Sequence, residues 1–244
     1  MKKFLMTIIF VLIIIFIVLI YSRFIGVKGL DTNEIVINAS VSESYDGLKI
    51  VHFSDLHYKK VITEKRVKEL VKEINKIDAD IVIFTGDLID NDYSNEEVIK
   101  NIYIQSNFTL LRNEDTVIYN EDNKKIYIGG IDSYTKGNAY VNKLEDIDDV
   151  LYKIILVHEP DYIDNIIKSK PNTNLILSGH SINGSINILG IKKLLLPKYA
   201  KKYYKPYYKV NNTDIYISNG IGVNDVNFRL FNTPSINFYR FNSK

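Results

Sequence analysis

The chain has 244 residues, a formal net charge of +2 and no cysteine. This length has room for a membrane anchor and one domain of about 210 residues with a sizeable core. The lack of cysteine excludes disulfides, thiolate nucleophiles and cysteine metal sites. The small net charge gives no reason to expect a nucleic-acid partner.

A long apolar run opens the chain. Residues 4–20 are apolar apart from Thr7, and two lysines precede them. With Tyr21 the run is just long enough to cross a bilayer core, which takes about 20 residues. A cleaved signal peptide is the alternative, but its apolar stretch would be shorter and a cleavage site of small residues should follow. The chain instead continues Tyr-Ser-Arg-Phe-Ile, so we expect an uncleaved anchor at residues 4–21.

The anchor divides the chain into two units. We expect the anchor and its juxtamembrane segment at residues 1–28, and a single domain at residues 29–244. Positive charges on the two sides of the apolar run nearly balance, so the positive-inside rule decides little. An N-terminal anchor followed by a long domain usually places that domain outside. We therefore expect a single-pass protein of the cell membrane, with its domain on the extracytoplasmic side.

The first half of the domain alternates strands with a helix. Residues 34–38 alternate enough to form an edge strand, and residues 48–53 and 81–85 are runs typical of buried strands. Between the two buried strands a helix is expected from Thr63, its N-cap. Its apolar face consists of Val67, Leu70, Val71 and Ile74. Strand, helix and strand within about 40 residues predict a right-handed βαβ unit.

The second half repeats the alternation less regularly. Strands are predicted at residues 125–131, 154–157, 175–177, 203–210, 214–218 and 235–241, and a short helix at residues 161–167. Asn211 and Asn212 indicate a hairpin turn between two of the last strands. The pattern predicts one α/β domain with two layers of mixed sheet.

Five side chains that can bind metal follow four of these strands. Asp55 and His57 follow one strand, while Asp87, His158 and His180 each follow another. Ligands collect beyond the carboxyl ends of strands in open α/β sheets, so the five can converge on one rim. The two oxygens of Asp87 could bridge two ions. Carboxylates and imidazoles without sulfur suit Mn, Fe or Zn better than calcium.

The motifs around these residues resemble the calcineurin-like metallophosphoesterase family, particularly its bacterial branch with one N-terminal membrane helix. The similarity runs from about residue 48 to residue 241 and includes residues 110–114 and 214–220. It rests on the segments Ser54-Asp55-Leu56-His57, Gly86-Asp87, His158-Glu159-Pro160 and Ser178-Gly179-His180. The resemblance implies a metallophosphoesterase-type β-sandwich of mixed sheets flanked by helices, with two metals at its rim.

The same resemblance implies a role for each ligand. Asp55 and His57 would hold the first metal, Asp87 would bridge both, and His158 and His180 would hold the second. The implied reaction is hydrolysis of a phosphoester by a metal-bound hydroxide, whose formation two divalent ions promote.

Two parts of the family pattern are missing from this sequence. The family's Asn-His motif supplies a ligand of the second metal and the proton donor, and nothing between Asp87 and Leu110 matches it. That segment is short by a strand in comparison with the family. In the motif Gly-His-x-His, Ile182 stands where the first metal's last histidine belongs. The resemblance therefore leaves no catalytic residue beyond the metal ligands.

Replacements for the missing groups are few. Asn183, Asn107 or Asn91 could offer an oxygen, but no spacing argument supports them. The only other histidine, His52, lies inside a predicted strand, where we expect it to be packed in the core.

Two hypotheses remain open. The first is a membrane-anchored, metal-dependent phosphoesterase that acts near the bilayer on a phosphodiester, with a lipid-linked substrate as one candidate. The alternative is a degenerate homologue that no longer turns over and serves as a membrane-tethered binding or structural protein. Lysines between residues 192 and 205 form a loose basic patch, which is either simply solvated or attracts an anionic phospholipid or phosphate.

Overall fold

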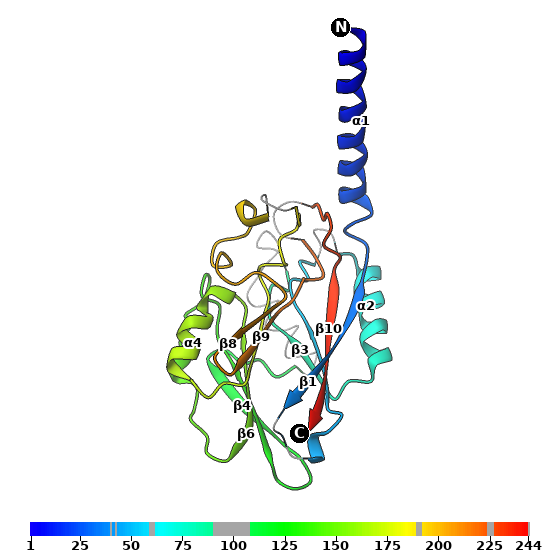
Figure 1. Ribbon diagram of the computed structural model, residues 1–244. Coiled ribbons are helices and arrows are strands. Elements are labelled where there is room, and N and C mark those ends of the chain that lie inside the picture. Colours follow the sequence, from blue (N-terminus) through cyan, green and yellow to red (C-terminus); the bar gives the residue numbers. More distant parts are fainter. Residues whose placement is uncertain are drawn as a thin grey trace.

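The computed structural model shows a long helix projecting from an α/β domain (Figure 1). It describes residues 1–39, 41, 43–58, 62–89, 108–188, 192–223 and 227–243. The projecting helix is α1 (Lys2–Phe24). By length and composition it could cross a membrane, a property that signal sequences near an N-terminus share. The structure thus confirms a helix at the apolar run, while its retention as an anchor stays a prediction.

One sheet of four strands carries the first half of the domain. Its strands are β1 (Asp31–Ala39), β2 (Lys49–Phe53), β3 (Ile81–Phe84) and β10 (Ser235–Ser243). Their order is β1-β10-β2-β3. β2 and β3 are parallel, whereas β10 runs antiparallel to β2. The predicted edge strand is confirmed, since β1 pairs only with β10 among the described strands.

The predicted βαβ unit is confirmed, but the prediction for one residue of its helix is wrong. The connecting helix, α2, spans Glu64–Ile77, and Thr63 caps it by accepting a hydrogen bond from the backbone N–H of Arg66. Leu70 is buried as expected, but Val71 is 48% exposed. Val71 lies at the margin of a narrow apolar stripe, where the helix turns away from the sheet.

The second sheet has six strands in the order β4-β5-β6-β7-β9-β8. These are β4 (Glu114–Tyr119), β5 (Lys125–Gly130), β6 (Val150–Val157), β7 (Leu175–Ser178), β8 (Tyr207–Val210) and β9 (Thr213–Ile217). The inner four are parallel, and β4 and β8 pair antiparallel at the two edges. Two mixed sheets confirm the predicted fold class. Helices η4 (Pro160–Tyr162) and α4 (Ile163–Ser169) confirm the predicted short helix. The other short helices among the described residues are η1 (Glu43–Tyr45), η3 (Val141–Lys143) and η5 (Lys192–Leu194).

Some boundaries differ from the prediction. β4 was not predicted, because its sequence Glu-Asp-Thr-Val-Ile-Tyr has neither a buried run nor clear alternation. β8 begins only at Tyr207, so residues 203–206 are not strand. The hairpin turn is confirmed, with Asn211 at a positive φ of 53° between β8 and β9. The segment that was predicted to be short by one strand falls largely outside the described residues, as do Asn91 and Asn107.

Apolar side chains from both sheets form the core between them. Ile50 of β2 and Tyr239 of β10 are fully buried against Ile126, Ile154 and Leu175 of the other sheet. The parallel strands β2, β3, β6 and β7 end at one rim of this sandwich. Figure 1 shows the loops beyond these ends gathered at the end of the domain from which α1 projects.

Candidate metal centre

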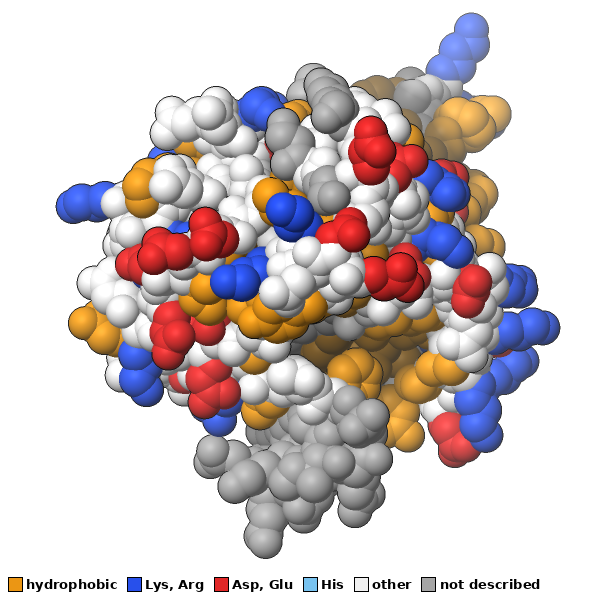
Figure 2. Space-filling view, turned by 90° about the horizontal axis from the view of Figure 1, so that it is seen from below, with side chains coloured by type: hydrophobic (Ala, Val, Ile, Leu, Met, Phe, Trp, Pro, Cys, Tyr) orange, Lys and Arg blue, Asp and Glu red, His pale blue; other side chains and the backbone are white. Residues whose placement is uncertain are grey.

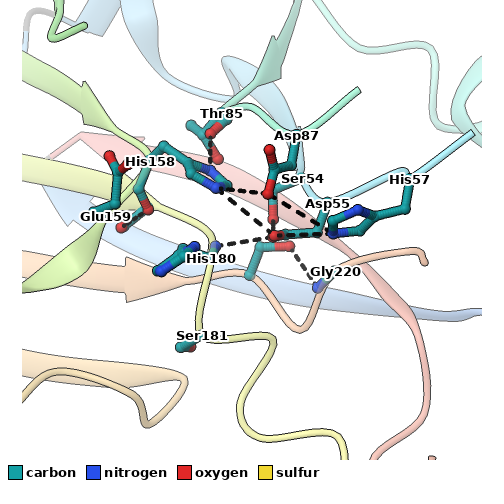
Figure 3. A network of polar contacts seen from close by, with 12 residues as sticks. Ser54, Asp55, His57, Thr85, Asp87, His158, Glu159, His180, Ser181 and Gly220 are labelled. Carbon is teal, nitrogen blue, oxygen red and sulfur yellow. Dashed lines mark hydrogen bonds and ion pairs between the residues drawn. The ribbon is translucent and has the colours of Figure 1, made fainter. Parts of the chain in front are cut away.

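The structure brings all five predicted ligands together (Figure 3). They form two groups, Asp55 with His57 and Asp87, and Asp87 with His158 and His180. Within each group the ligand atoms lie within 4.8 Å of one another. Asp87 belongs to both groups. This is the arrangement that two neighbouring cations with a shared carboxylate require.

Four of these residues have an uncommon backbone conformation. The φ angles of Asp55, His57, Asp87 and His180 lie between +48° and +64°. Asp and His tolerate this left-handed region better than most residues, and clusters of such conformations mark functional sites. The loops after β2 and β3 are also joined, since the backbone N–H of Asp55 donates to the carbonyl of Gly86 at 2.9 Å. The strand ends therefore hold the ligands in fixed positions.

Gly86 allows the two sheets to meet at this point. Its φ is +109°, and a Cβ atom there would lie 2.8 Å from His158 Nδ1. Any other residue would push the His158 ring away from Asp87.

Asp55 is fully buried, and among the described residues only one of its oxygens accepts hydrogen bonds. Oδ2 accepts hydrogen bonds from the hydroxyl of Ser54 and from the backbone N–H of His180 at 3.0 Å. Oδ1 has no hydrogen-bond partner among the described residues. It lies 3.9 Å from Nε2 of both His57 and His158.

His158 also has a ring nitrogen without a hydrogen-bond partner, and this nitrogen lies near Asp55 Oδ1. Its Nδ1 donates to the carbonyl of Thr85 at 2.7 Å, which leaves Nε2 as the free nitrogen. That buried Nε2 has no hydrogen-bond partner in the described structure, and it lies 3.3 Å from Asp87 Oδ2. A buried polar atom without a partner costs about 1–3 kcal/mol. A divalent cation beside Asp55 Oδ1 and His158 Nε2 would satisfy both atoms, so the donor set fits a metal.

The pKa shifts within the cluster also fit a cation site. Burial alone would lower the pKa of His158, but contact with Asp87 and the charges of Asp55, Asp87 and Glu159 raise it to about 9. Burial opposes ionisation of Asp87, but His158, His57 and Lys136 hold its pKa well below its usual range. The surrounding carboxylates therefore favour a positive charge at His158 Nε2. Proton and cation compete for the same nitrogen.

His180 is oriented by its own backbone partner. Nε2 donates to the carbonyl of Lys198 at 2.8 Å, and this contact fixes the ring. The ring lies edge-on to that of His158, with 5.0 Å between centroids. Such contacts from outside the ligand set hold metal-binding histidines in place.

Sequence reasoning missed Arg229, which stabilises a loop that contacts Asp55. Its side chain is fully buried, and its guanidinium donates to the carbonyls of Asn219, Gly220 and Gly222. The loop it holds, residues 219–222, donates from the Gly222 N–H to the Asp55 carbonyl at 2.7 Å. The only signal was a charged residue within the apolar sequence Asn-Phe-Arg-Leu-Phe.

The other expected residues have clear surroundings. Ile182 is buried, and Asn183 Oδ1 accepts a hydrogen bond from Lys192 Nζ, so that oxygen does not replace a ligand. His52 is fully buried, with Nε2 2.8 Å from Thr85 Oγ1. Burial lowers the pKa of His52 to about 3. It is a neutral core histidine, as predicted.

Comparison with known proteins finds a family domain and several relatives. Residues 48–130 match the model for calcineurin-like phosphoesterases. The chain is 29% identical to the uncharacterized metallophosphoesterase YkuE of Bacillus subtilis, over 91% of this chain and 89% of that protein. Their alignment runs over 257 positions and includes 91% of the 244 residues here, about 222, so YkuE has about 35 positions that this chain lacks (257 − 222).

More distant relatives are longer. An uncharacterized metallophosphoesterase of Helicobacter pylori strain J99 is 27% identical over 79% of this chain, which covers 59% of that protein. A bovine transmembrane protein with a metallophosphoesterase domain is 25% identical over 77% of this chain, which covers 51% of it. No solved protein structure gives a significant match. The family model, these relatives and the two mixed sheets agree: the chain contains a calcineurin-like metallophosphoesterase domain and is similar to proteins named metallophosphoesterases.

Proposed function

We propose that this protein is a membrane-anchored, metal-dependent phosphoesterase that hydrolyses phosphodiesters. The observation that carries the proposal is that Asp87 belongs to both ligand groups. Asp55 and His57 would complete one cation site, and His158 and His180 the other. Two divalent ions (Mn, Fe or Zn) bound there would supply an activated water and neutralise charge on the phosphoryl oxygens.

The end of helix α1 is hydrogen-bonded to the segment around Arg229, which supports this site. The backbone N–H of Arg229 donates to the carbonyl of Ser22 in the last turn of α1 at 3.0 Å. Arg23 Nη1 donates to the carbonyl of Asn227 at 3.2 Å. Arg229 in turn holds the loop that bonds to Asp55. The rim that carries the ligands therefore lies at the α1 end of the domain (Figure 1), which favours a substrate at the bilayer surface.

The surface beside the site suits an anionic bilayer. Leu194 and Leu195 are 78% and 51% exposed, and lysines flank them in the sequence. This segment borders the site, since His180 bonds to the carbonyl of Lys198. Exposed apolar side chains among lysines favour contact with anionic lipid. The face seen from below, away from α1, carries acidic side chains interspersed among basic and apolar ones (Figure 2). A lipid-linked phosphodiester is the substrate class that this arrangement favours.

The proposal is tested on the full chain purified in detergent. We expect it to bind Mn²⁺ and to hydrolyse bis-(p-nitrophenyl) phosphate faster than p-nitrophenyl phosphate when Mn²⁺ is present. A phospholipid in mixed micelles should compete with the aryl diester. If the chain bound no Mn²⁺, Fe²⁺ or Zn²⁺ and showed no turnover, the proposed phosphoesterase activity would be refuted.

One observation favours the alternative, a degenerate homologue with a binding or structural role. By its resemblance to the family motif, Ile182 stands where a histidine is expected, and a Cβ atom added to Gly220 would lie 2.5 Å from Ile182 Cγ2 and 3.0 Å from the Cβ of Asp55. The backbone of Ile182 has a φ of +40°, which strains a β-branched residue. The conformation thus suits histidine better than the isoleucine present.

Restoring this histidine should strengthen metal binding. We expect Ile182→His to raise the affinity for Mn²⁺ by about 10-fold or more, because it adds an imidazole beside Asp55 and relieves the backbone. Isothermal titration of the purified chain measures the change. Ile182→Asn is the matched control, since asparagine relieves the backbone without adding an imidazole. Equal affinities in the two variants would contradict the placement of residue 182 in the first cation site.

A further inference from the structure

Lys136 stands at the open side of the metal centre. Its Nζ lies 3.6 Å from Asp87 Oδ1, and the side chains are 55% and 23% exposed. Asp55, the other carboxylate, is fully buried. A molecule that approaches from solvent therefore meets Asp87 and Lys136 before it meets Asp55. An exposed ion pair of this kind contributes only about 0–1 kcal/mol to stability, so folding alone gives little reason for the lysine to be placed here.

A buried carboxylate builds the loop that presents Lys136. Glu159 is fully buried, directly after the candidate ligand His158. It accepts hydrogen bonds from the hydroxyl of Ser133 at 2.7 Å, from the N–H of Tyr134 at 3.0 Å, and from the N–H and hydroxyl of Thr135 at 3.1 and 2.6 Å. A buried charge is tolerated only when it is bonded in this way. Glu159 thereby fixes the loop relative to the metal centre.

A second carboxylate closes the same loop on its other side. Asp132 accepts from the N–H groups of Ser133 at 2.9 Å and Asn138 at 3.1 Å. A Cβ atom on Gly137 would lie 2.4 Å from the Asp132 carboxylate, so a larger residue next to Lys136 would displace that carboxylate. The N–H of Gly137 donates to the carbonyl of Ser133 at 3.0 Å. The backbone of Lys136 is therefore held between two anchored ends, and its partly exposed side chain extends to Asp87.

We propose that Lys136 binds a phosphoryl oxygen of the substrate at the mouth of the site. The inference rests on the proposed function, because it assumes that a phosphoester enters this centre. An ammonium group on a flexible stem is a suitable partner for a phosphate oxygen, which it contacts as a point charge with three donors. Its ion pair with Asp87 keeps it at the rim until the anion arrives. It acts by charge and hydrogen bonding and transfers no proton.

The experiment titrates inorganic phosphate into the full chain in detergent, with and without saturating Mn²⁺. We expect Lys136→Gln to bind Mn²⁺ with the stoichiometry of the parent chain but to bind phosphate about 10-fold more weakly, the equivalent of about 1.4 kcal/mol. Lys136→Arg should restore most of the phosphate affinity, since it keeps the charge. With an aryl phosphodiester, Lys136→Gln should raise KM.

Lys209 provides the matched control. Its Nζ pairs with Asp214 at 3.0 Å, and the side chains are 53% and 25% exposed, close to the values of the Lys136 pair. Lys209→Gln should leave phosphate binding unchanged. Unchanged phosphate affinity in Lys136→Gln, with or without a change in Mn²⁺ affinity, would overturn the inference and leave Lys136 as a surface ion-pair partner of Asp87. If the parent chain bound phosphate through Lys136 but hydrolysed no phosphodiester, the proposed enzymatic activity would be refuted, while the phosphate-binding role of Lys136 would stand.

Discussion

Asp87→Asn should reduce metal-dependent phosphodiester hydrolysis by about 10³-fold or more, the equivalent of about 4 kcal/mol of transition-state stabilisation. Asp87 is the one residue shared by the two ligand groups. The amide keeps the size of the side chain but removes the negative charge that pairs with His57 and His158 at 3.8 and 3.3 Å. Both cation sites should weaken together, which no other single ligand change should cause.

Metal content and kinetics measure this prediction on the same preparation. Metal analysis should show fewer bound ions in Asp87→Asn, and added Mn²⁺ should restore only part of the activity. Asp214→Asn is the control, because Asp214 is a partly exposed carboxylate paired with Lys209 away from the site. It should lose less than about twofold in rate. An Asp87→Asn chain with parental turnover would show that the five residues are not the centre that hydrolyses the diester.

The strand-end ligands could be predicted because local sequence decides them. Asp55 and Asp87 directly follow short apolar runs, and parallel strands bring such ends to one rim. The structure adds what local sequence does not contain, namely which atoms remain unpaired. That Asp55 Oδ1 and His158 Nε2 face each other at 3.9 Å depends on residues 103 positions apart in the chain (158 − 55).

The supporting contacts could not be predicted for the same physical reason. Glu159 follows a candidate ligand and reads as an ordinary polar residue, yet its partners lie in the loop at residues 133–135. The sequence gave no signal for Lys136, because lysine is ordinarily an exposed, solvated residue. β4 was missed since its pairing with β5 decides its structure, not its own pattern. Long-range pairing overrides weak local preference in such edge strands.

Arg229→Met should lower the free energy of unfolding by about 3 kcal/mol or more, since it leaves several buried carbonyls without a donor. In a chain of this length, that loss corresponds to a fall in Tm of about 6–12 °C. The guanidinium donates to Asn219, Gly220 and Gly222, with its closest contact at 2.5 Å to Gly222. Thermal unfolding of the full chain in detergent measures the change. Arg240→Met is the control, because Arg240 makes surface contacts, an exposed pair with Glu34 at 2.9 Å and a position over the Phe238 ring, and its Tm should fall by no more than about 4 °C.

This substitution also separates the site's support from its tie to α1. The hydrogen bond from residue 229 to Ser22 uses the backbone N–H, so methionine keeps it. Residues 219–222, which bond to the backbone of Ser54 and Asp55, lose the charged group that holds them. Arg229→Met should therefore weaken Mn²⁺ binding even well below its Tm, and Arg229→Lys should recover little, because one ammonium does not reproduce the planar fork. Parental Mn²⁺ affinity in a folded Arg229→Met chain would mean that Asp55 keeps its place without this loop.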